Sequence, residues 1–148
     1  MIASVDHQAL AEFRYQIRCF LVFSEHEARA AGIEPHQHQL LLAIKGLPEG
    51  QRPTIGMLAE RLQVRHHSAV ELVNRLVARR LAVRRRGDLD AREVLIQVTA
   101  QGERLLTRLS LAHRSELRTV GPRLVRGLRA ILAPPSAPGK GSKKARLQ

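Results

Sequence analysis

The stretch Thr54–Thr99 constrains the fold of this chain more than any other, because the spacing of its apolar residues changes from a helical to a strand period. Two short amphipathic helices are expected first, the second from about His66 to Arg80. Two strand-like segments follow, LAVRRR and EVLIQVT, and they enclose GDLDAR, whose glycine and aspartates favour a hairpin turn. The order helix, turn, helix, hairpin predicts a winged helix-turn-helix.

Amphipathic segments lie on the N-terminal side of this stretch. Residues 6–31 are expected to form one long helix that ends before Gly32. Pro35 opens a second helix that ends at Gly46. Residues 54–55 are then expected to form a very short strand before the helix-turn-helix begins.

The C-terminal side of the stretch is also expected to be helical. Thr99 is a suitable cap for a fifth helix, because its hydroxyl can accept from a backbone N–H of the first turn. Gly121–Pro122 is expected to break or kink this helix. A last helix then carries Leu124, Leu128 and Ile131.

The chain carries a net charge of +12, which favours a polyanionic partner such as nucleic acid. Aromatic residues make up only 3% of it, which argues against the stacking platforms that bind single strands. The sequence contains neither a Gly-rich phosphate loop nor a nucleophile elbow, so we expect no enzyme and no cofactor. Double-stranded DNA is therefore the expected partner.

The second helix of the helix-turn-helix has the composition of a DNA-reading helix. Ala69, Leu72 and Val73 are expected to face the core, which leaves polar and basic side chains outside. We expect Glu71 to pair with Arg75 at i,i+4 and orient its guanidinium, although a carboxylate can also accept from a cytosine amino group. The candidate DNA-binding residues of this helix are Arg65, His66, His67, Ser68, Glu71 and Arg75.

The hairpin supplies a second basic element, a wing. Strand alternation is expected to place Arg84 and Arg86 on one face and Arg85 on the other. At the tip, Asp90 is expected to hold the Arg92 guanidinium extended toward a DNA groove. The alternative is an aspartate that caps its own turn beside a solvated arginine. The candidate wing residues are Arg84, Arg86, Asp90 and Arg92.

The helices outside the helix-turn-helix and wing predict a dimer. The first helix is too long and too apolar to be covered by one small lobe, and with the terminal helices it exposes a continuous Leu and Phe surface. We therefore expect a winged-helix domain over residues 1–132. Its DNA-binding lobe is expected at about 35–99 and its dimerisation helices at about 6–31 and 100–132. Residues 133–148, rich in Pro, Gly, Ser and Lys, are expected to form a basic disordered tail.

The chain resembles the MarR-type winged-helix transcriptional regulators over about residues 10–120. The matching segments are FLVFSEHEARAAG, PHQHQLLLAIKG, TIGMLAERLQVRHHSAVELVNRL and RRRGDLDAREVLIQVTAQGERLL. The resemblance implies a homodimer that binds a pseudo-palindromic operator as a repressor, with a cleft for a small apolar or aromatic effector. Asp90 and Arg92 match the wing Asp and Arg of the family, whereas Ala91 stands where a second arginine is frequent. Arg65 stands where the family frequently has a small polar cap.

Cys19 is the single cysteine, which excludes an internal disulfide, and it follows the cationic Arg18. In the organic-hydroperoxide-sensing branch of the resembled family, a reactive cysteine occupies a comparable position with tyrosines beside it. Tyr15 is the one tyrosine here. Two alternatives to a ligand-responsive repressor therefore stay open: a Cys19-based redox-sensing regulator and a non-specific architectural DNA-binding protein.

The remaining features are expected absences. The histidines form no close-set pair at i,i+4, and His36 and His38 point to different faces of their helix, so we expect no metal site. No apolar run reaches 18 residues and the N-terminus has no signal-peptide pattern, so we expect no membrane span. The cytoplasm is the expected location.

Overall fold

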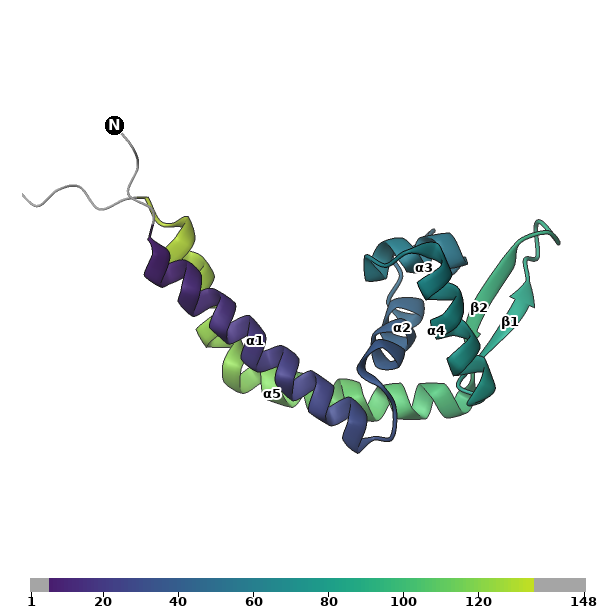
Figure 1. Ribbon diagram of the computed structural model, residues 1–148, viewed down its shortest axis with the longest axis horizontal. Coiled ribbons are helices and arrows are strands. Elements are labelled where there is room, and N and C mark those ends of the chain that lie inside the picture. The colour runs from purple at the N-terminus through teal and green to yellow at the C-terminus, as the bar shows by residue number, and fades with distance from the viewer. Residues whose placement is uncertain (1–5, 135–148) are drawn as a thin grey trace, which may run out of the picture.

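Five helices and one β-hairpin form the described part of the chain, residues 6–134 of a computed structural model (Figure 1). The predicted mainly α-helical fold with a hairpin wing is confirmed. The expected disordered tail lies outside the described residues from position 135 onward. The elements are α1 (His7–Ala30), α2 (Pro35–Lys45), α3 (Ile55–Leu62), α4 (His66–Ala78), β1 (Ala82–Arg86), β2 (Val94–Val98) and α5 (Ala100–Leu132).

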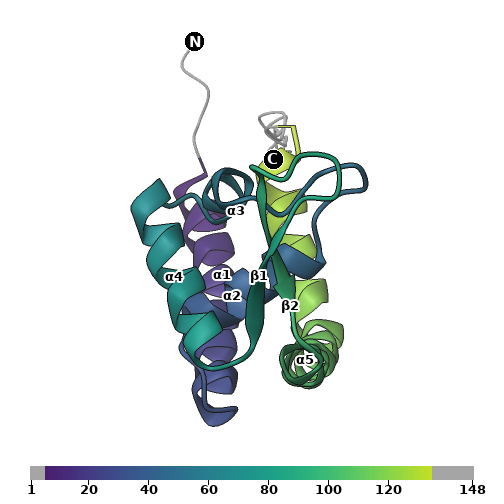
Figure 2. The same ribbon diagram turned by 90° about the vertical axis from the view of Figure 1, so that its right-hand side faces the viewer.

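The elements divide into a two-helix arm and a compact lobe. α1 lies along the second half of α5 and forms the arm, and both described ends of the chain lie at its tip (Figure 1). α2, α3, α4 and the hairpin gather at the other end, over the first half of α5 (Figures 1 and 2). α5 therefore belongs to both parts. No described helix combines the length and the apolar composition needed to cross a membrane.

The lobe is held together by one aliphatic core. Leu40 and Leu41 of α2, Leu58 of α3 and Leu76 of α4 are fully buried there, together with Ile96 of β2. Three leucines at the start of α5 complete this core, at the i, i+1 and i+4 positions that share one helix face. They are Leu105, Leu106 and Leu109.

Short polar residues fix where the helices begin. The Asp6 carboxylate accepts from the N–H of Ala9 at 2.9 Å and caps α1. The Thr99 hydroxyl accepts from the N–H of Gly102 at 3.1 Å and caps α5, as the sequence predicts. The very short strand expected at residues 54–55 is wrong, because the Thr54 hydroxyl caps α3 instead and accepts from the N–H of Met57.

Two helix ends also depart from the expected ranges. α4 stops at Ala78 rather than Arg80, because Arg80 takes a left-handed conformation (φ 58°) and Leu81 donates back to the carbonyl of Leu76. The expected break at Gly121–Pro122 is wrong, since α5 continues through it for 33 residues. Packing against α1 accounts for this continuity: Phe13 fits closely against Gly127, one turn beyond the proline. Figure 1 shows the direction of α5 changing along its length.

Gly102 marks the closest approach between α5 and the hairpin. A Cβ atom added there would overlap the carbonyl oxygen of Leu81 and lie 2.8 Å from Cγ1 of Val98. We expect Gly102→Ala to lower the free energy of unfolding by about 1–3 kcal/mol, because backbone or α5 must move to admit a methyl group. Chemical denaturation would measure this loss.

Gly56→Ala is the matched control, since nothing lies within 4 Å of a Cβ added at Gly56 in α3. It should change stability by less than about 1 kcal/mol, in the stabilising direction, because alanine favours helix. Equal effects of the two substitutions would show that the junction between α5 and the hairpin is not tightly packed.

Candidate DNA-binding interface and adjoining cleft

The exposed edge of α4 carries the residues that the sequence assigns to DNA contact. We call Arg65, His66, His67, Ser68, Glu71 and Arg75 the recognition edge. All are exposed except Ser68, which is half-buried. The opposite face buries Ala69, Leu72, Val73 and Leu76, so the predicted division of this helix into two faces is confirmed.

The start of α4 places its first cations beside a helix N-terminus. Arg65 is the N-cap residue, in an extended conformation, and its side chain makes no capping hydrogen bond. Its guanidinium therefore stays available, while the first N–H groups of α4 point outward beside it. An N-terminus with free N–H groups and an adjacent guanidinium suits a phosphate.

The ion pair expected between Glu71 and Arg75 is wrong: the described residues show no contact within 4 Å between their charged groups. An exposed i,i+4 pair is worth only about 0.2–0.5 kcal/mol, too little to hold two solvated side chains together. Arg75 instead borders a hollow that it shares with His36 and Gln39 at the start of α2.

The wing is an antiparallel hairpin in which Arg84 pairs with Ile96 and Arg86 with Val94. Strand alternation predicts Arg84 and Arg86 on one face and Arg85 on the other. Both faces of the strand are exposed at these positions, since Val83 to Arg86 are all exposed. Arg84 donates to the side-chain carbonyl of Asn74 on α4, which ties the wing to the recognition helix. Arg86 donates to the carbonyl of Ala91 at 2.9 Å and crosses the wing turn.

At the wing tip, Asp90 caps its own turn, which is the second of the two arrangements considered from the sequence. Asp90 Oδ1 accepts from the backbone N–H of Arg92 at 2.9 Å, and no described ion pair joins the two side chains. The expectation that Asp90 holds the guanidinium is therefore wrong, because the aspartate satisfies a turn N–H that has no other partner. The Arg92 side chain is left exposed at the tip.

One stabilising contact of the wing escapes sequence reasoning. Arg52, in the loop before α3, forms an ion pair with Glu93 at 2.9 Å beside Gly87. In addition, the N–H of Ile96 donates to the carbonyl of Pro53 at 2.9 Å. The loop thus supports the wing at β2 and beside its turn, and because the partners are distant in sequence no local pattern signals it.

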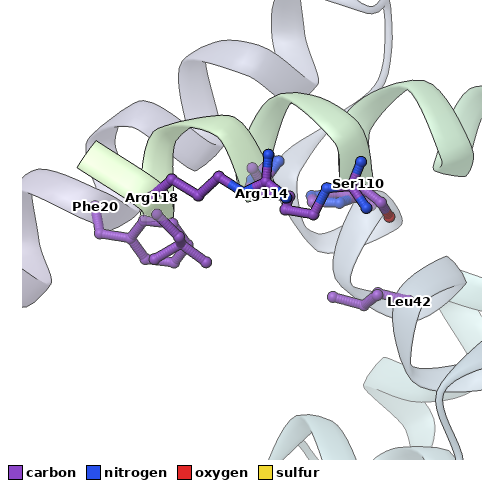
Figure 3. Close-up of a pocket in the computed structure, with 8 residues that line it drawn as sticks. Phe20, Leu42, Ser110, Arg114 and Arg118 are labelled. Carbon is purple, nitrogen blue, oxygen red and sulfur yellow. The ribbon is translucent and has the colours of Figure 1, made fainter. Parts of the chain in front are cut away.

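A cleft of about 480 Å³ opens between α1, α2 and α5 (Figure 3). Its apolar walls come from Phe20, Leu42 and Leu117, while Arg114 and Arg118 lie along its α5 side. A second hollow of about 330 Å³ adjoins it and shares Leu42, Ser110 and Arg114. The lining can hold an apolar ligand, and its two arginines can bind an acidic group on such a ligand.

Two histidines meet at the base of this cleft. His38 of α2 lies with its ring centroid 4.9 Å from that of His113 on α5. His113 Nδ1 lies 2.7 Å from the carbonyl oxygen of Leu109, and its Nε2 lies 2.7 Å from the hydroxyl of Ser24 on α1. The edges of Phe20 and Phe23 enclose the His113 ring.

His38 is buried with only 3% of its surface exposed, and its Nδ1 has no hydrogen-bond partner. Burial and the neighbouring His113 lower the pKa of His38 to about 4. His36, two residues earlier, is exposed, so the two side chains lie on different faces as predicted. Sequence reasoning did not assign His38 or His113 to a site, because the pair forms only when α2 packs on α5.

Cys19 is exposed on α1, one turn after Tyr15. Hydrogen bonding with the Cys19 side chain is the main cause that raises the pKa of the Tyr15 hydroxyl above its usual value. The phenol therefore stays protonated beside the sulfur. Among the described residues, no group of three or more His, Cys, Asp or Glu side chains is arranged to hold a metal ion.

A helix-turn-helix with an exposed basic edge, followed by a basic hairpin, defines a winged-helix DNA-binding protein. Residues 31–93 match the family model described as MarR family. This match spans most of the lobe, so over this segment the chain resembles the MarR-family winged-helix transcription regulators, and solved structures of such regulators share its fold. No curated protein matches the chain in sequence.

Solved structures with the same fold cover nearly the whole chain. AbsC, a MarR family transcriptional regulator from Streptomyces coelicolor, has a TM-score of 0.69 at 16% identity and covers 90% of this chain and 93% of its own. A mutant MepR of S. aureus bound to an oligodeoxyribonucleotide has a TM-score of 0.62 at 18% identity, covering 87% and 94%. CouR from Rhodococcus jostii bound to p-coumaroyl-CoA has a TM-score of 0.65 at 20% identity, covering 93% and 100%.

The buried, neutral His38 predicts an acid-sensitive stability. Its pKa is lowered from 6.5 to about 4, so below pH 6.5 the unfolded chain binds a proton that the folded protein does not. The corresponding stability is complete above pH 6.5 and is lost as the pH falls toward 4. We expect a loss of about 2 kcal/mol by about pH 5, measured by urea unfolding against a reference near pH 7.5.

His38→Gln should lose clearly less stability over this range, because glutamine takes up no proton. His36→Gln, which changes the exposed histidine two residues away, is the matched control and should keep the wild-type dependence. A His38→Gln variant that loses as much stability as wild type would show that the acid sensitivity arises elsewhere.

Proposed function

We propose that this regulator is a cytoplasmic homodimer that represses transcription from a pseudo-palindromic operator and releases it when a small apolar or aromatic ligand enters the cleft. The main support for the proposal is that the recognition edge and the basic wing lie on one lobe and are joined by the hydrogen bond between Arg84 and Asn74. A helix held against a wing suits simultaneous contact with a major groove and the flanking backbone.

In the proposed complex, the recognition edge reads the major groove. Arg65, His66, His67 and Ser68 lie at the N-terminal end of α4, where base edges and a phosphate are both in reach. Glu71 and Arg75 lie one and two turns further along, and the free carboxylate of Glu71 suits a cytosine amino group. Of the wing residues, Arg92 enters the groove, while Arg84, Arg86 and Asp90 shape the wing that presents it.

The dimer proposal is supported by apolar residues that the arm leaves exposed. Large hydrophobic side chains recur along α1 and α5 although each is at least one-third exposed in the single chain. A band of this kind on a two-helix arm is unusual for a monomer and suits a second copy. Its members on the two helices are Leu10, Tyr15, Ile17, Leu21, Val22, Leu117, Val125, Leu128 and Leu132.

The effector proposal is supported by the position of the cleft. It lies between the arm and the lobe, where an occupant changes how the lobe sits on α5 and hence the spacing of two recognition helices in a dimer. CouR, which shares the fold, is bound to a thioester ligand, and a mutant MepR with the same fold is bound to an oligonucleotide.

Footprinting of the DNA upstream of the gene for this chain tests the proposal. We expect one protected pseudo-palindrome that survives excess random DNA and disappears with one member of a panel of phenolic and aromatic compounds. Protection that random DNA competes away would instead identify an architectural binder. Protection that no compound affects would contradict the ligand-responsive part.

Arg92→Ala tests the wing assignment. The Arg92 side chain is exposed, so its loss should leave folding unchanged and weaken operator binding by about 1–3 kcal/mol. Fluorescence anisotropy with the footprinted fragment would measure it. Arg104→Ala removes another exposed arginine, on α5 and outside the wing, and should weaken binding far less. Equal losses would mean that Arg92 contributes only its charge.

The contact between Tyr15 and Cys19 favours a second candidate, a redox-sensing regulator. A phenol that stays protonated beside the thiol can donate a hydrogen bond to an oxidised sulfur. On this candidate, hydrogen peroxide should abolish the operator footprint of wild type and leave that of Cys19→Ser intact. Peroxide without effect on the wild-type footprint would exclude a Cys19-based signal.

A further inference from the structure

Two consecutive residues of α2, Gln37 and His38, are the buried polar side chains of the described part of the chain. Gln37 is 6% exposed and His38 is 3% exposed. Burying polar groups costs free energy unless they find partners, so such residues need a reason. Here the two neighbours lie in the same helical turn and contact different parts of the protein.

Gln37 connects α2 to the recognition helix. Its Oε1 accepts from the N–H of Glu34 at 3.1 Å and lies 3.4 Å from a guanidinium nitrogen of Arg79. Arg79, the C-cap residue of α4, also donates to the carbonyl of Gly32 at 2.6 Å, in the turn between α1 and α2. One arginine thus ties the end of the recognition helix to the junction of the arm and the lobe.

His38 connects the same turn to the cleft. Its ring packs against His113 of α5, which is bonded in turn to Ser24 of α1. The described residues that line the cleft with His38 include no carboxylate: they are Phe20 of α1, Leu42 of α2, and Ser110, His113, Arg114, Leu117 and Arg118 of α5. A group entering the cleft therefore meets His38, whose Nδ1 is buried without a partner, on the turn of α2 whose Gln37 contacts Arg79.

Because α4 is long, a small movement at Arg79, where α4 is tied to the first turn of α2, becomes a larger movement at the other end of α4. α4 has 13 residues, with the tie at its C-terminal end and the first part of the recognition edge, Arg65 to Ser68, at its N-terminal end. At 1.5 Å per residue the two ends are about 20 Å apart. A rotation of about 5° at the tie would move Arg65 to Ser68 by about 2 Å, enough to misplace base contacts.

We propose that the first turn of α2 is the coupling joint of this regulator, with Arg79 as the positioning residue that transmits the state of the cleft to the recognition helix. The inference rests on the proposed ligand-responsive function and states how the ligand would act on DNA binding. Occupancy of the cleft displaces His38, Gln37 moves with it because both belong to one turn, and Arg79 carries the movement into α4.

A cleft-filling substitution tests the joint without an identified ligand. Ser110 is exposed on α5 and lines both hollows, so Ser110→Trp places an indole where an effector would lie. We expect Ser110→Trp to weaken binding to the footprinted operator at least fivefold. In the Arg79→Gln background the same substitution should weaken binding less than twofold, and in the Arg79→Lys background by an intermediate factor. Each variant is first checked by thermal unfolding and size-exclusion chromatography, and Ser110→Phe replaces any Trp variant that fails to fold.

Arg104 supplies matched controls, since it is exposed on α5 and lines neither hollow. Arg104→Trp adds the same bulk and Arg104→Gln removes the same charge, and each should leave operator affinity within twofold of wild type. Equal factors for Ser110→Trp in both backgrounds overturn the inference while the footprint stands. A folded Ser110→Trp protein that binds the operator as tightly as wild type also overturns the inference. Absence of any specific footprint in wild type would contradict the proposed function itself.

Discussion

The packing of one helix against two partners governs this structure. The first turns of α5 bury Leu105, Leu106 and Leu109 in the core of the lobe, and its later turns lie along α1. Gly102 lets α5 approach the hairpin closely enough for the Thr99 hydroxyl to donate to the carbonyl of Arg80 at 2.7 Å. Because α5 is continuous, any change in how the lobe sits on it changes the angle between lobe and arm.

The basic residues of the DNA-binding lobe fall into two groups with different roles. Arg84 and Arg52 fix the wing against α4 and the loop before α3, and Arg86 holds the wing turn through the carbonyl of Ala91. Arg65 and Arg92 make none among the described side-chain contacts, and they lie at the start of α4 and at the wing tip. A rigid support with free cations at its ends loses little side-chain order on binding a fixed groove.

Local periodicity explains how much of this fold the sequence predicts. The spacing of Ala69, Leu72 and Val73 identifies the buried face of α4, and the Thr99 hydroxyl identifies the start of α5, because both depend on neighbours within one helical turn. Pro122 shows the limit of such reasoning. Its local preference is to end a helix, but packing between α1 and α5 outweighs the loss of one backbone hydrogen bond.

The candidate site is less predictable than the fold, because its contacts depend on tertiary structure or on small energy differences. The sequence identifies the recognition edge from its exposure, yet it cannot decide whether Glu71 prefers Arg75 or water, since the two differ by a few tenths of a kcal/mol. His38 and His113 come together only through the packing of α2 on α5. This pair, which lines the cleft, is therefore visible only in the folded chain.

The charge of the chain adds a further constraint on the proposed dimer. Two copies that each carry +12 repel one another, so the exposed apolar band on α1 and α5 must outweigh that repulsion before DNA is present. DNA phosphates remove part of the repulsion when they neutralise the arginines of both lobes. In the proposed dimer, binding to DNA and association of the two copies would then strengthen each other by linkage, and a ligand that misaligns the lobes would weaken the DNA-bound dimer. On the proposed function, the cleft between arm and lobe is where a small molecule would act on that dimer.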